Sequence, residues 1–344
     1  FFFKQTPAYE MLRSLVGSEM CIRDSVNRFP DMLEQAYREA VSGCPGPVHL
    51  QFQGNEGQVD LGEADLEQRT DMRFTSVPPF RPQGEEGDIL ATLDILQKSK
   101  KPVIISGGGV KYSKASAALT QFAEGLNIPV ATSLNGKDTF LANHPLSAGV
   151  VGTYSRGAAN QIVKNADTVC FIGTKSGGMT THFWNIPELR IPAIQIDIDP
   201  AEINKTVKVD SPIIGDINEV LELLNPKVKS ETHTSWLKEV EHLKSEHPSL
   251  MIPESETLLG QQVIKTLSDL TEGSAIVCTG VGQHQMWAAQ HYSFKKDSTW
   301  LSSGGLGTMG YEIPSAIGAQ ICLLYTSDAA DEGLGVDLGG RRII

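Results

Sequence analysis

The sequence predicts an α/β protein built from parallel-sheet, Rossmann-like domains. Short apolar runs rich in valine and isoleucine alternate with segments of helical periodicity, and glycines or prolines separate the two. Apolar runs bounded by turn signals are typical of strands buried on both faces. Strands that alternate with helices indicate a parallel sheet with helices on each side. A chain of 344 residues should hold two or more such domains.

Before the central sheet, the sequence predicts the end of a first domain at residues 26–61. Residues 31–42 have helical periodicity, a Gly-Pro cluster at 43–47 breaks the helix, and 48–52 is a strand. A polar linker rich in Gly, Pro and Glu follows at 62–88.

Residues 89–226 have the pattern of a complete α/β domain. The expected helices span 89–98, 115–126, 158–165 and 217–224. The expected strands span 102–106, 128–132, 168–172 and 193–197, with an extended segment at 207–214. Residues 227–256 are expected to form a linker that contains a charged helix. Residues 257–321 begin a third domain with a helix at 257–270 and a strand at 275–278.

Composition excludes several functional classes. The net charge of −12 argues against a nucleic-acid-binding protein, which needs a basic face for the phosphates. There is no apolar run long enough for a transmembrane helix, so we expect no membrane partner. The five cysteines are scattered without metal-site spacing, which favours buried, reduced thiols and a cytoplasmic protein.

Both ends differ in character from the sequence beside them. Residues 1–25 contain SEMCIRDS and residues 322–344 contain CLLYTSDAADE, and both resemble translated sequencing-adapter segments. The first end lacks the apolar core and cleavage site of a signal peptide. We therefore expect residues 1–25 and 322–344 to be foreign to the native protein.

Two glycine-containing loops carry the clearest functional signal. GQHQMWAAQ at residues 282–290 follows a predicted strand, and SSGGLGTMG at residues 302–310 precedes a small-residue helix near 313. A glycine turn between a strand and a helix lets backbone N–H groups face an anion at the helix N-terminus. The pair of loops therefore predicts a phosphate-binding site.

This pair of loops resembles the diphosphate-binding domain of thiamine-diphosphate enzymes, and within them the acetolactate synthase (acetohydroxyacid synthase) large subunits. The resemblance places Val281, Gly282, Gln283 and His284 at the cofactor diphosphate. It places Gly307 and Met309 under the thiazolium ring, although Met309 could instead fill a core. Residues 26–61 then resemble the end of a pyrimidine-binding domain, and 257–321 the start of a diphosphate-binding domain.

The resemblance also implies groups that this chain does not carry. The activating glutamate belongs to the earlier part of the first domain, and the Mg²⁺ ligands follow position 321, so no catalytic residue and no metal ligand is assigned. Residues 311–314 read Tyr-Glu-Ile-Pro where the family usually has Phe-Gly-Leu-Pro, so Glu312 stands in place of a glycine. Because the family site lies between two subunits, a homodimer or homotetramer is implied.

In acetolactate synthases the central domain holds FAD, and several positions here match in type and spacing. These are Gly107, Gly108, Gly109, Ser133, Leu134, Gly152, Gly173, Lys175, Asp197, Ile198 and Asp216. The family's arginine-rich loop is here GTKSGGM at 173–179, which leaves only Lys175 for a phosphate. A lysine cannot reproduce the bidentate fork of an arginine. FAD, another adenine nucleotide and no ligand therefore remain open.

The resemblance implies a fragment of a thiamine-diphosphate-dependent carboligase with Mg²⁺ as the second cofactor. Such an enzyme decarboxylates a 2-oxo acid such as pyruvate and joins the remaining unit to a second 2-oxo acid. Two alternatives stay open. One is a lyase, decarboxylase or dione hydrolase that uses the same cofactor, and the other is a nucleotide-binding module without catalysis. We expect the fragment alone to be inactive.

Overall fold

The computed structural model describes residues 20–22, 29–52, 71–155, 157–188, 190–229, 233–248, 251–297 and 299–323. It forms two compact units, Phe1–Pro82 and Gln83–Ile344. Of the two ends expected to be foreign, only residues 20–22 and 322–323 fall among the described residues. The expectation for the remainder lies outside them.

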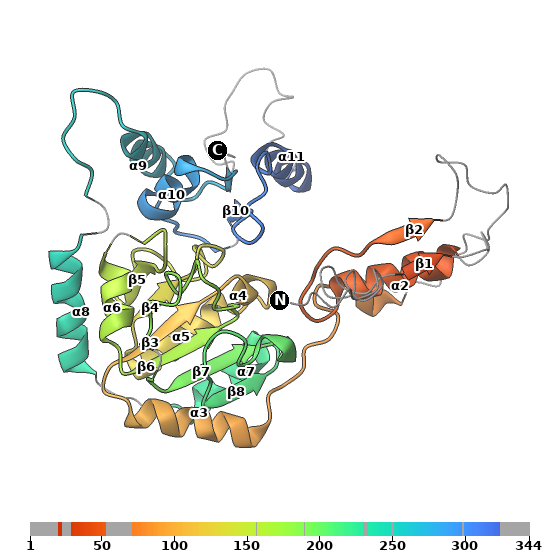
Figure 1. The fold of residues 1–344 in the computed structure, drawn as a ribbon, viewed down its shortest axis with the longest axis horizontal. Coiled ribbons are helices and arrows are strands. Elements are labelled where there is room, and N and C mark those ends of the chain that lie inside the picture. Colours follow the sequence, from red (N-terminus) through yellow and green to blue (C-terminus); the bar gives the residue numbers. More distant parts are fainter. Residues whose placement is uncertain are drawn as a thin grey trace, which may run out of the picture. The chain divides into compact units, whose positions relative to one another are not determined.

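Among the described residues, the first unit contains a helix, two short strands and one 3₁₀ turn (Figure 1). Helix α2 (Phe29–Val41) and strand β2 (Leu50–Phe52) confirm the helix and strand predicted from the sequence, with shifted ends. β2 pairs in parallel with β1 (Met20–Ile22), which the sequence does not predict. The 3₁₀ turn Met72–Thr75 is capped by the side chain of Asp71, which accepts a hydrogen bond from the backbone N–H of Arg73 at 3.0 Å.

The second unit is organised around a six-stranded sheet in which every neighbouring pair is parallel. The strand order is β5-β4-β3-β6-β7-β8, so the chain moves outward in one direction, returns to the centre at β6, and then moves the other way. This is the doubly wound order, and it confirms the predicted α/β fold. The strands are β3 (Pro102–Ser106), β4 (Val130–Thr132), β5 (Ser147–Val150), β6 (Thr168–Ile172), β7 (Ala193–Asp197) and β8 (Ser211–Ile214).

Helices cover both faces of this sheet, as the apolar strand sequences require. One core combines side chains of the sheet with α3 (Glu86–Lys98), α5 (Ser116–Leu126) and α7 (Ile217–Leu224). The other core combines the opposite side of the sheet with α6 (Ala158–Asn165) and α8 (Thr234–Glu246). Strands β3, β6 and β7 are buried along their whole length because they lie between the two cores.

Helix α8 lies within the segment that the sequence predicts as a linker with a charged helix. The structure packs this helix on the sheet through Trp236 and Val240, both fully buried. The indole Nε1 of Trp236 donates to the backbone oxygen of Pro102 at 2.9 Å, at the start of β3. The charged residues that suggest a linker lie on the outer side of α8, while its inner side completes the second core.

The chain then forms a smaller C-terminal segment, residues 260–323. It contains α9 (Gly260–Leu270), β9 (Val277–Thr279), α10 (Gln283–His291), β10 (Trp300–Ser302) and α11 (Glu312–Cys322). β9 and β10 pair in parallel. The core of the segment gathers Tyr292, Phe294 and Trp300 together with Leu134 and Val150 from loops and strands of the central sheet. The segment is thus packed directly on the central domain.

The cysteines follow the prediction only in part. Cys170 is buried in β6, and desolvation raises the pKa of its thiol to about 12. Cys44 and Cys322 are exposed, so the expectation that the thiols are buried is wrong for these two. In the part of the chain that the structure describes, no helix is long and apolar enough to cross a membrane.

Replacing Trp236 with alanine should destabilise the protein by about 3–5 kcal/mol, because the change empties a fully buried site and leaves the Pro102 carbonyl without its donor. The free energy of unfolding, measured by urea titration of the full chain, checks this. Lys238→Ala on the exposed side of the same helix is the matched control and should change stability by less than about 0.5 kcal/mol. Equal effects of the two changes would contradict the packing of α8 on the sheet.

Candidate functional site

The loops at the carboxyl ends of the parallel strands form one edge of the central sheet. The order in which strands are added to the sheet reverses between β3 and β6, although the two strands are parallel. The loops that follow β3 and β6 therefore lead away from each other, and α/β proteins bind ligands between such loops. Gly107 follows β3 and Gly173 follows β6. Ser133 follows β4, Gly152 follows β5 and Asp197 ends β7, so the fold brings the predicted nucleotide residues to this common edge.

The predicted diphosphate residues lie at the N-terminus of α10. Gly282 precedes the helix with φ 158° and ψ −166°, a region open essentially to glycine alone. Gln283 and His284 form the first turn and are exposed, and the first N–H groups of a helix have no partner within it. The next residue, Gln285, is buried, and its Nε2 donates to Ser302 Oγ at 2.6 Å. This bond fixes the start of α10 to the end of β10.

The second glycine loop lies beside the first. A methyl group built on Gly307, which has φ 70°, would lie 4.0 Å from Val281 Cγ1. Met309 is 81% exposed, so the interpretation of Met309 as a core filler is wrong for the described chain. The loops thus bring Val281, Gly282 and Gly307 together and leave the Met309 side chain accessible for a ligand.

Glu312, the residue that departs from the family pattern, lies against the first loop. A methyl group built on Gly280 would come within 2.1 Å of Glu312 Oε2, so the carboxylate lies directly against this glycine. Glu312 Oε2 is buried and has no hydrogen-bond partner among the described residues. A buried carboxylate oxygen without a donor is costly, which indicates that a further group completes this corner of the site.

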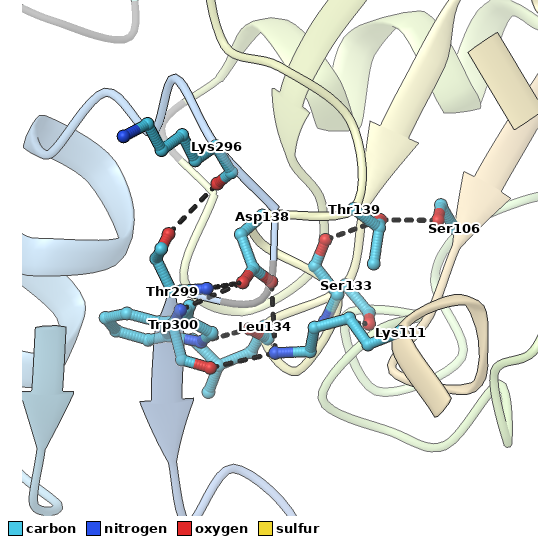
Figure 2. A network of polar contacts seen from close by, with 10 residues as sticks. Ser106, Lys111, Ser133, Leu134, Asp138, Thr139, Lys296, Thr299 and Trp300 are labelled. Atoms are coloured by element: carbon cyan, nitrogen blue, oxygen red, sulfur yellow. Dashed lines mark hydrogen bonds and ion pairs between the residues drawn. The ribbon is translucent and has the colours of Figure 1, made fainter. Parts of the chain in front are cut away.

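A buried carboxylate, Asp138, joins the central domain to the C-terminal segment (Figure 2). Its Oδ2 accepts hydrogen bonds from the backbone N–H groups of Thr299 and Trp300 at 2.8 and 2.9 Å. Its Oδ1 forms an ion pair with Lys111 Nζ at 3.0 Å, and Lys111 Nζ also donates to the Trp300 carbonyl at 2.8 Å. The indole Nε1 of Trp300 donates to the Leu134 carbonyl at 2.7 Å.

The loop that carries Asp138 is itself held to the end of β3. Ser133 N–H donates to the Ser106 carbonyl at 2.8 Å, and the hydroxyls of Ser106 and Thr139 share a hydrogen bond at 2.6 Å. Lys111 belongs to the short helix α4 (Gly109–Tyr112), which directly follows the glycine run after β3. The central-domain edge and the two glycine loops are therefore connected through the buried Asp138 and the part-buried Lys111.

The glycines predicted to bind a nucleotide are tightly packed against neighbouring backbone. A methyl group on Gly107 would lie 2.1 Å from the Gly173 carbonyl oxygen, and one on Gly173 would lie 2.4 Å from Ile217 Cδ1. A methyl group on Gly152 would lie 1.9 Å from the Met179 carbonyl oxygen, whereas one on Gly108 would lie 3.4 Å from Asn135 Cβ. Packing between loops accounts for these glycines without a ligand.

The polar members of the predicted nucleotide set also have partners within the protein. Asp216 is the N-cap of α7 and accepts from the N–H groups of Asn218 and Glu219. Lys175 Nζ lies 3.6 Å from Glu202 Oε1. Asp197 is buried beside the half-buried Ile198, and its Oδ1 accepts from Asp199 N–H at 3.0 Å, while burial raises the pKa of its carboxyl group.

Two hydroxyls on the same edge are orphaned. Thr153 Oγ1 and Ser155 Oγ, in the loop after β5, are buried and have no hydrogen-bond partner among the described residues. They lie in the same loop as Gly152, one of the residues that the sequence predicts for a nucleotide. They are the observation on this edge that favours a bound polar ligand.

Sequence reasoning does not identify Lys111 or Asp138. Lys111 lies in a one-turn helix and Asp138 in a loop, and the backbone N–H groups that Asp138 accepts from lie about 160 positions away in the sequence. No spacing rule connects such residues. Among the described residues, no group of three or more His, Cys, Asp or Glu side chains could hold a metal ion.

Asp138→Ala should destabilise the protein by about 3–5 kcal/mol, because it removes the ion-pair partner of Lys111 and leaves two buried backbone N–H groups without their acceptor. Hydrogen exchange of the full chain should show faster exchange at Thr299 and Trp300 than in β6, since the C-terminal segment loses its anchor first. Asp94→Ala, which removes an exposed ion pair with Lys98 in α3, is the control and should leave both exchange rates unchanged. A uniform effect on all strands would contradict a local anchoring role.

Comparisons with known proteins agree with this arrangement. The family model described as the thiamine pyrophosphate enzyme central domain matches residues 89–224. The model described as the C-terminal TPP binding domain of the same enzymes matches residues 280–333. The two matches cover the six-stranded sheet and the segment that carries both glycine loops.

Curated relatives include acetolactate synthase large subunits from bacteria and archaea. A probable large subunit from Methanocaldococcus jannaschii is 36% identical over 311 residues, which cover 87% of this chain and 52% of the relative. The isozyme 3 large subunit from Escherichia coli is 34% identical over 337 residues, which cover 93% of this chain and 57% of the relative. The large subunit from Corynebacterium glutamicum is 37% identical over 304 residues, which cover 86% of this chain and 47% of the relative. The chain thus spans about half the length of the relatives that it matches, and it belongs to the thiamine pyrophosphate enzymes, with acetolactate synthase large subunits among its relatives.

Proposed function

We propose that this chain is part of a thiamine-diphosphate-dependent carboligase of the acetolactate synthase type. The observation that carries the proposal is that similarity to acetolactate synthase large subunits covers most of the chain, including both the central sheet and the first diphosphate loop. The whole protein would decarboxylate a 2-oxo acid such as pyruvate and join the remaining two-carbon unit to a second 2-oxo acid.

The described residues support a binding role for the diphosphate. The backbone of Gly282 allows close approach, and the N-terminus of α10 presents N–H groups and the positive end of the helix dipole. Gln283 and His284 are exposed at this terminus and can donate to phosphate oxygens. Thiamine diphosphate, when bound, supplies the carbanion chemistry of the reaction. Met309, accessible in the adjoining loop, would support its thiazolium ring.

The remaining parts of the active site belong to the proposal as well. The activating glutamate and the Mg²⁺ ligands would come from other parts of the protein, and the site would lie between two subunits of a cytoplasmic homodimer or homotetramer. Along α11, the side chains of Ile313, Ile317 and Ile321 recur every four residues and are all more than half exposed. An apolar helix face of this kind supports packing against a further domain or subunit.

FAD is proposed for the edge of the central sheet. The unpaired, buried hydroxyls of Thr153 and Ser155 support it, whereas the engagement of Lys175 by Glu202 and the close packing of Gly107 on Gly173 do not. The visible absorption spectrum of the purified full-length protein tests this directly. A yellow protein with bound flavin supports FAD, and a colourless one leaves the central domain as a scaffold or as the site of another adenine nucleotide.

A second candidate function is a lyase or hydrolase that uses the same cofactor. The observation that favours it is Glu312, whose carboxylate lies against Gly280 at the diphosphate loop without a hydrogen-bond partner among the described residues. An acidic side chain there changes the charge next to the reacting groups. Glu312→Gly should leave acetolactate formation intact or improved in a synthase, and should abolish the native reaction in the alternative enzyme.

The full-length protein that contains residues 26–321 should form acetolactate from pyruvate when thiamine diphosphate and Mg²⁺ are supplied. The product can be measured after acid decarboxylation to acetoin. A protein that binds thiamine diphosphate but consumes no pyruvate would move the function to the lyase or hydrolase branch. A protein that does not bind thiamine diphosphate would contradict the proposed function as a whole.

His284→Ala should weaken thiamine diphosphate binding to the full-length protein about 10- to 150-fold, because one charge-assisted hydrogen bond contributes about 1.5–3 kcal/mol. The apparent dissociation constant can be followed by quenching of tryptophan fluorescence. His242→Ala on the exposed surface of α8 is the matched control and should bind the cofactor as the unchanged protein does. Unaltered binding by the His284 variant would remove this residue from the diphosphate site.

A further inference from the structure

A cavity of about 450 Å³ lies where the central domain meets the C-terminal segment. The central domain contributes the loop between β4 and β5, β5 itself and the end of α8. The C-terminal segment contributes the end of α10 and the residues after it, so the cavity is remote along this helix from Gln283 and His284 at its start. Its volume falls within the range of about 300–1,000 Å³ that is usual for small-molecule sites.

Lys137 is the central feature of this cavity. Only 7% of the residue is exposed, and burial lowers the pKa of its ammonium group to about 8. Among the described residues, no hydrogen bond or ion pair is formed by Lys137 Nζ, which lies 6.0 Å from the centre of the Phe294 ring. The neighbouring Asp138 does not serve as its partner, because that carboxylate is bound by Lys111, Thr299 and Trp300.

Asp138, the neighbour of Lys137 in the chain, is the negative charge that acts on its ammonium group, whereas the charged side chains that line the cavity favour an anion. Lys244, at the end of α8, also lines the cavity, and burial lowers the pKa of its ammonium group. His144 lines it as well, with its Nε2 3.1 Å from Glu124 Oε1. The other titratable lining groups are the phenols of Tyr154 and Tyr292, and no aspartate or glutamate lines the cavity. In a chain with net charge −12, this is a local cluster of cations.

The rest of the cavity wall combines apolar and polar side chains, and this combination restricts the chemical class of ligand that fits. Apolar surface comes from side chains such as Phe140, Pro145 and Val150. Hydroxyl and amide groups come from Thr132, Ser293 and Gln290. A buried ammonium without a counter-ion is unfavourable, and an anion within reach of it restores the interaction energy lost on leaving water. A ligand with one negative charge and an apolar body matches both parts of the wall.

We propose that this cavity binds a small organic monocarboxylate with an apolar body, with its carboxylate on Lys137 and Lys244. The ligand would contact both the central domain and the C-terminal segment, so binding would stabilise their junction. This site is separate from the diphosphate loops, and the proposal holds whatever reaction the whole protein catalyses. No described residue of the diphosphate site lines the cavity.

The pH dependence of binding follows from Lys137. In the empty cavity the ammonium group is protonated below about pH 8 and loses its proton above it. A bound carboxylate favours the protonated form, so ligand affinity is full below about pH 8 and falls above it. Between pH 7 and pH 9.5 the protonated fraction falls about 30-fold, and the apparent affinity should fall by up to the same factor.

The test is isothermal titration of the full 344-residue chain with isovalerate at pH 7 and pH 9.5. Isovaleramide, the uncharged amide of the same shape, and inorganic phosphate serve as the comparison ligands. Lys137→Met should abolish isovalerate binding, and Lys137→Arg should retain it while losing most of its pH dependence. Lys164→Met, which removes an exposed lysine from α6, should bind as the unchanged chain does.

Saturable binding of isovalerate, at least tenfold tighter than isovaleramide and weaker at pH 9.5, is the expected result. Equal binding of the acid and the amide would overturn the charge recognition, and tighter binding of phosphate would overturn the carboxylate class. Absence of binding at pH 7 would overturn the site itself. The comparison of the two pH values on the unchanged chain decides the matter even where the methionine variant does not fold.

Discussion

The carboxylate of Asp138 is the contact on which the arrangement of the second unit depends. The described C-terminal segment contributes only two strands, and a two-stranded sheet of three-residue strands is not stable alone in water. Asp138 attaches the segment to the central domain, because it accepts hydrogen bonds from two backbone N–H groups where β10 begins and forms an ion pair with Lys111. The Trp300 indole adds a hydrogen bond to Leu134 and fills the shared core. A buried charge is favourable here because donors surround it on both sides.

This anchor determines where the diphosphate loops can lie. β10 starts at Trp300, and its last residue, Ser302, accepts hydrogen bonds from Gln285 and Thr279. The position of β10 therefore fixes the N-terminus of α10, and with it Gly282 and the first free N–H groups. The same chain of contacts runs back through Lys111 on α4 to the glycine run after β3. A rigid scaffold of this kind keeps the donors oriented before the anion arrives, which is the condition for strong binding of a diphosphate.

The sequence predicts the central strands well because their burial is uniform. β3, β6 and β7 have the predicted bounds, since apolar runs packed on both faces leave no ambiguity about their limits. β5 escapes prediction because Ser147–Val150 contains a glycine and lacks a β-branched run; it is a strand only because β4 pairs with it. The two glycine loops are recognisable from local spacing alone. Lys137 and Asp138 are not, because their surroundings are assembled from segments distant in the sequence.

Lys137 and Asp138 also show why adjacent charges need not pair. They are neighbours in the chain, yet the loop directs Asp138 into the junction with β10 and Lys137 towards the cavity near the end of α10. Asp138 receives a lysine and two N–H donors, so its charge is compensated within the protein. Lys137 Nζ lies 6.0 Å from the centre of the Phe294 ring and forms no ion pair among the described residues, and burial lowers the pKa of its ammonium group although the charge of Asp138 raises it. The fold thus satisfies one charge of the pair completely and leaves the other for a ligand.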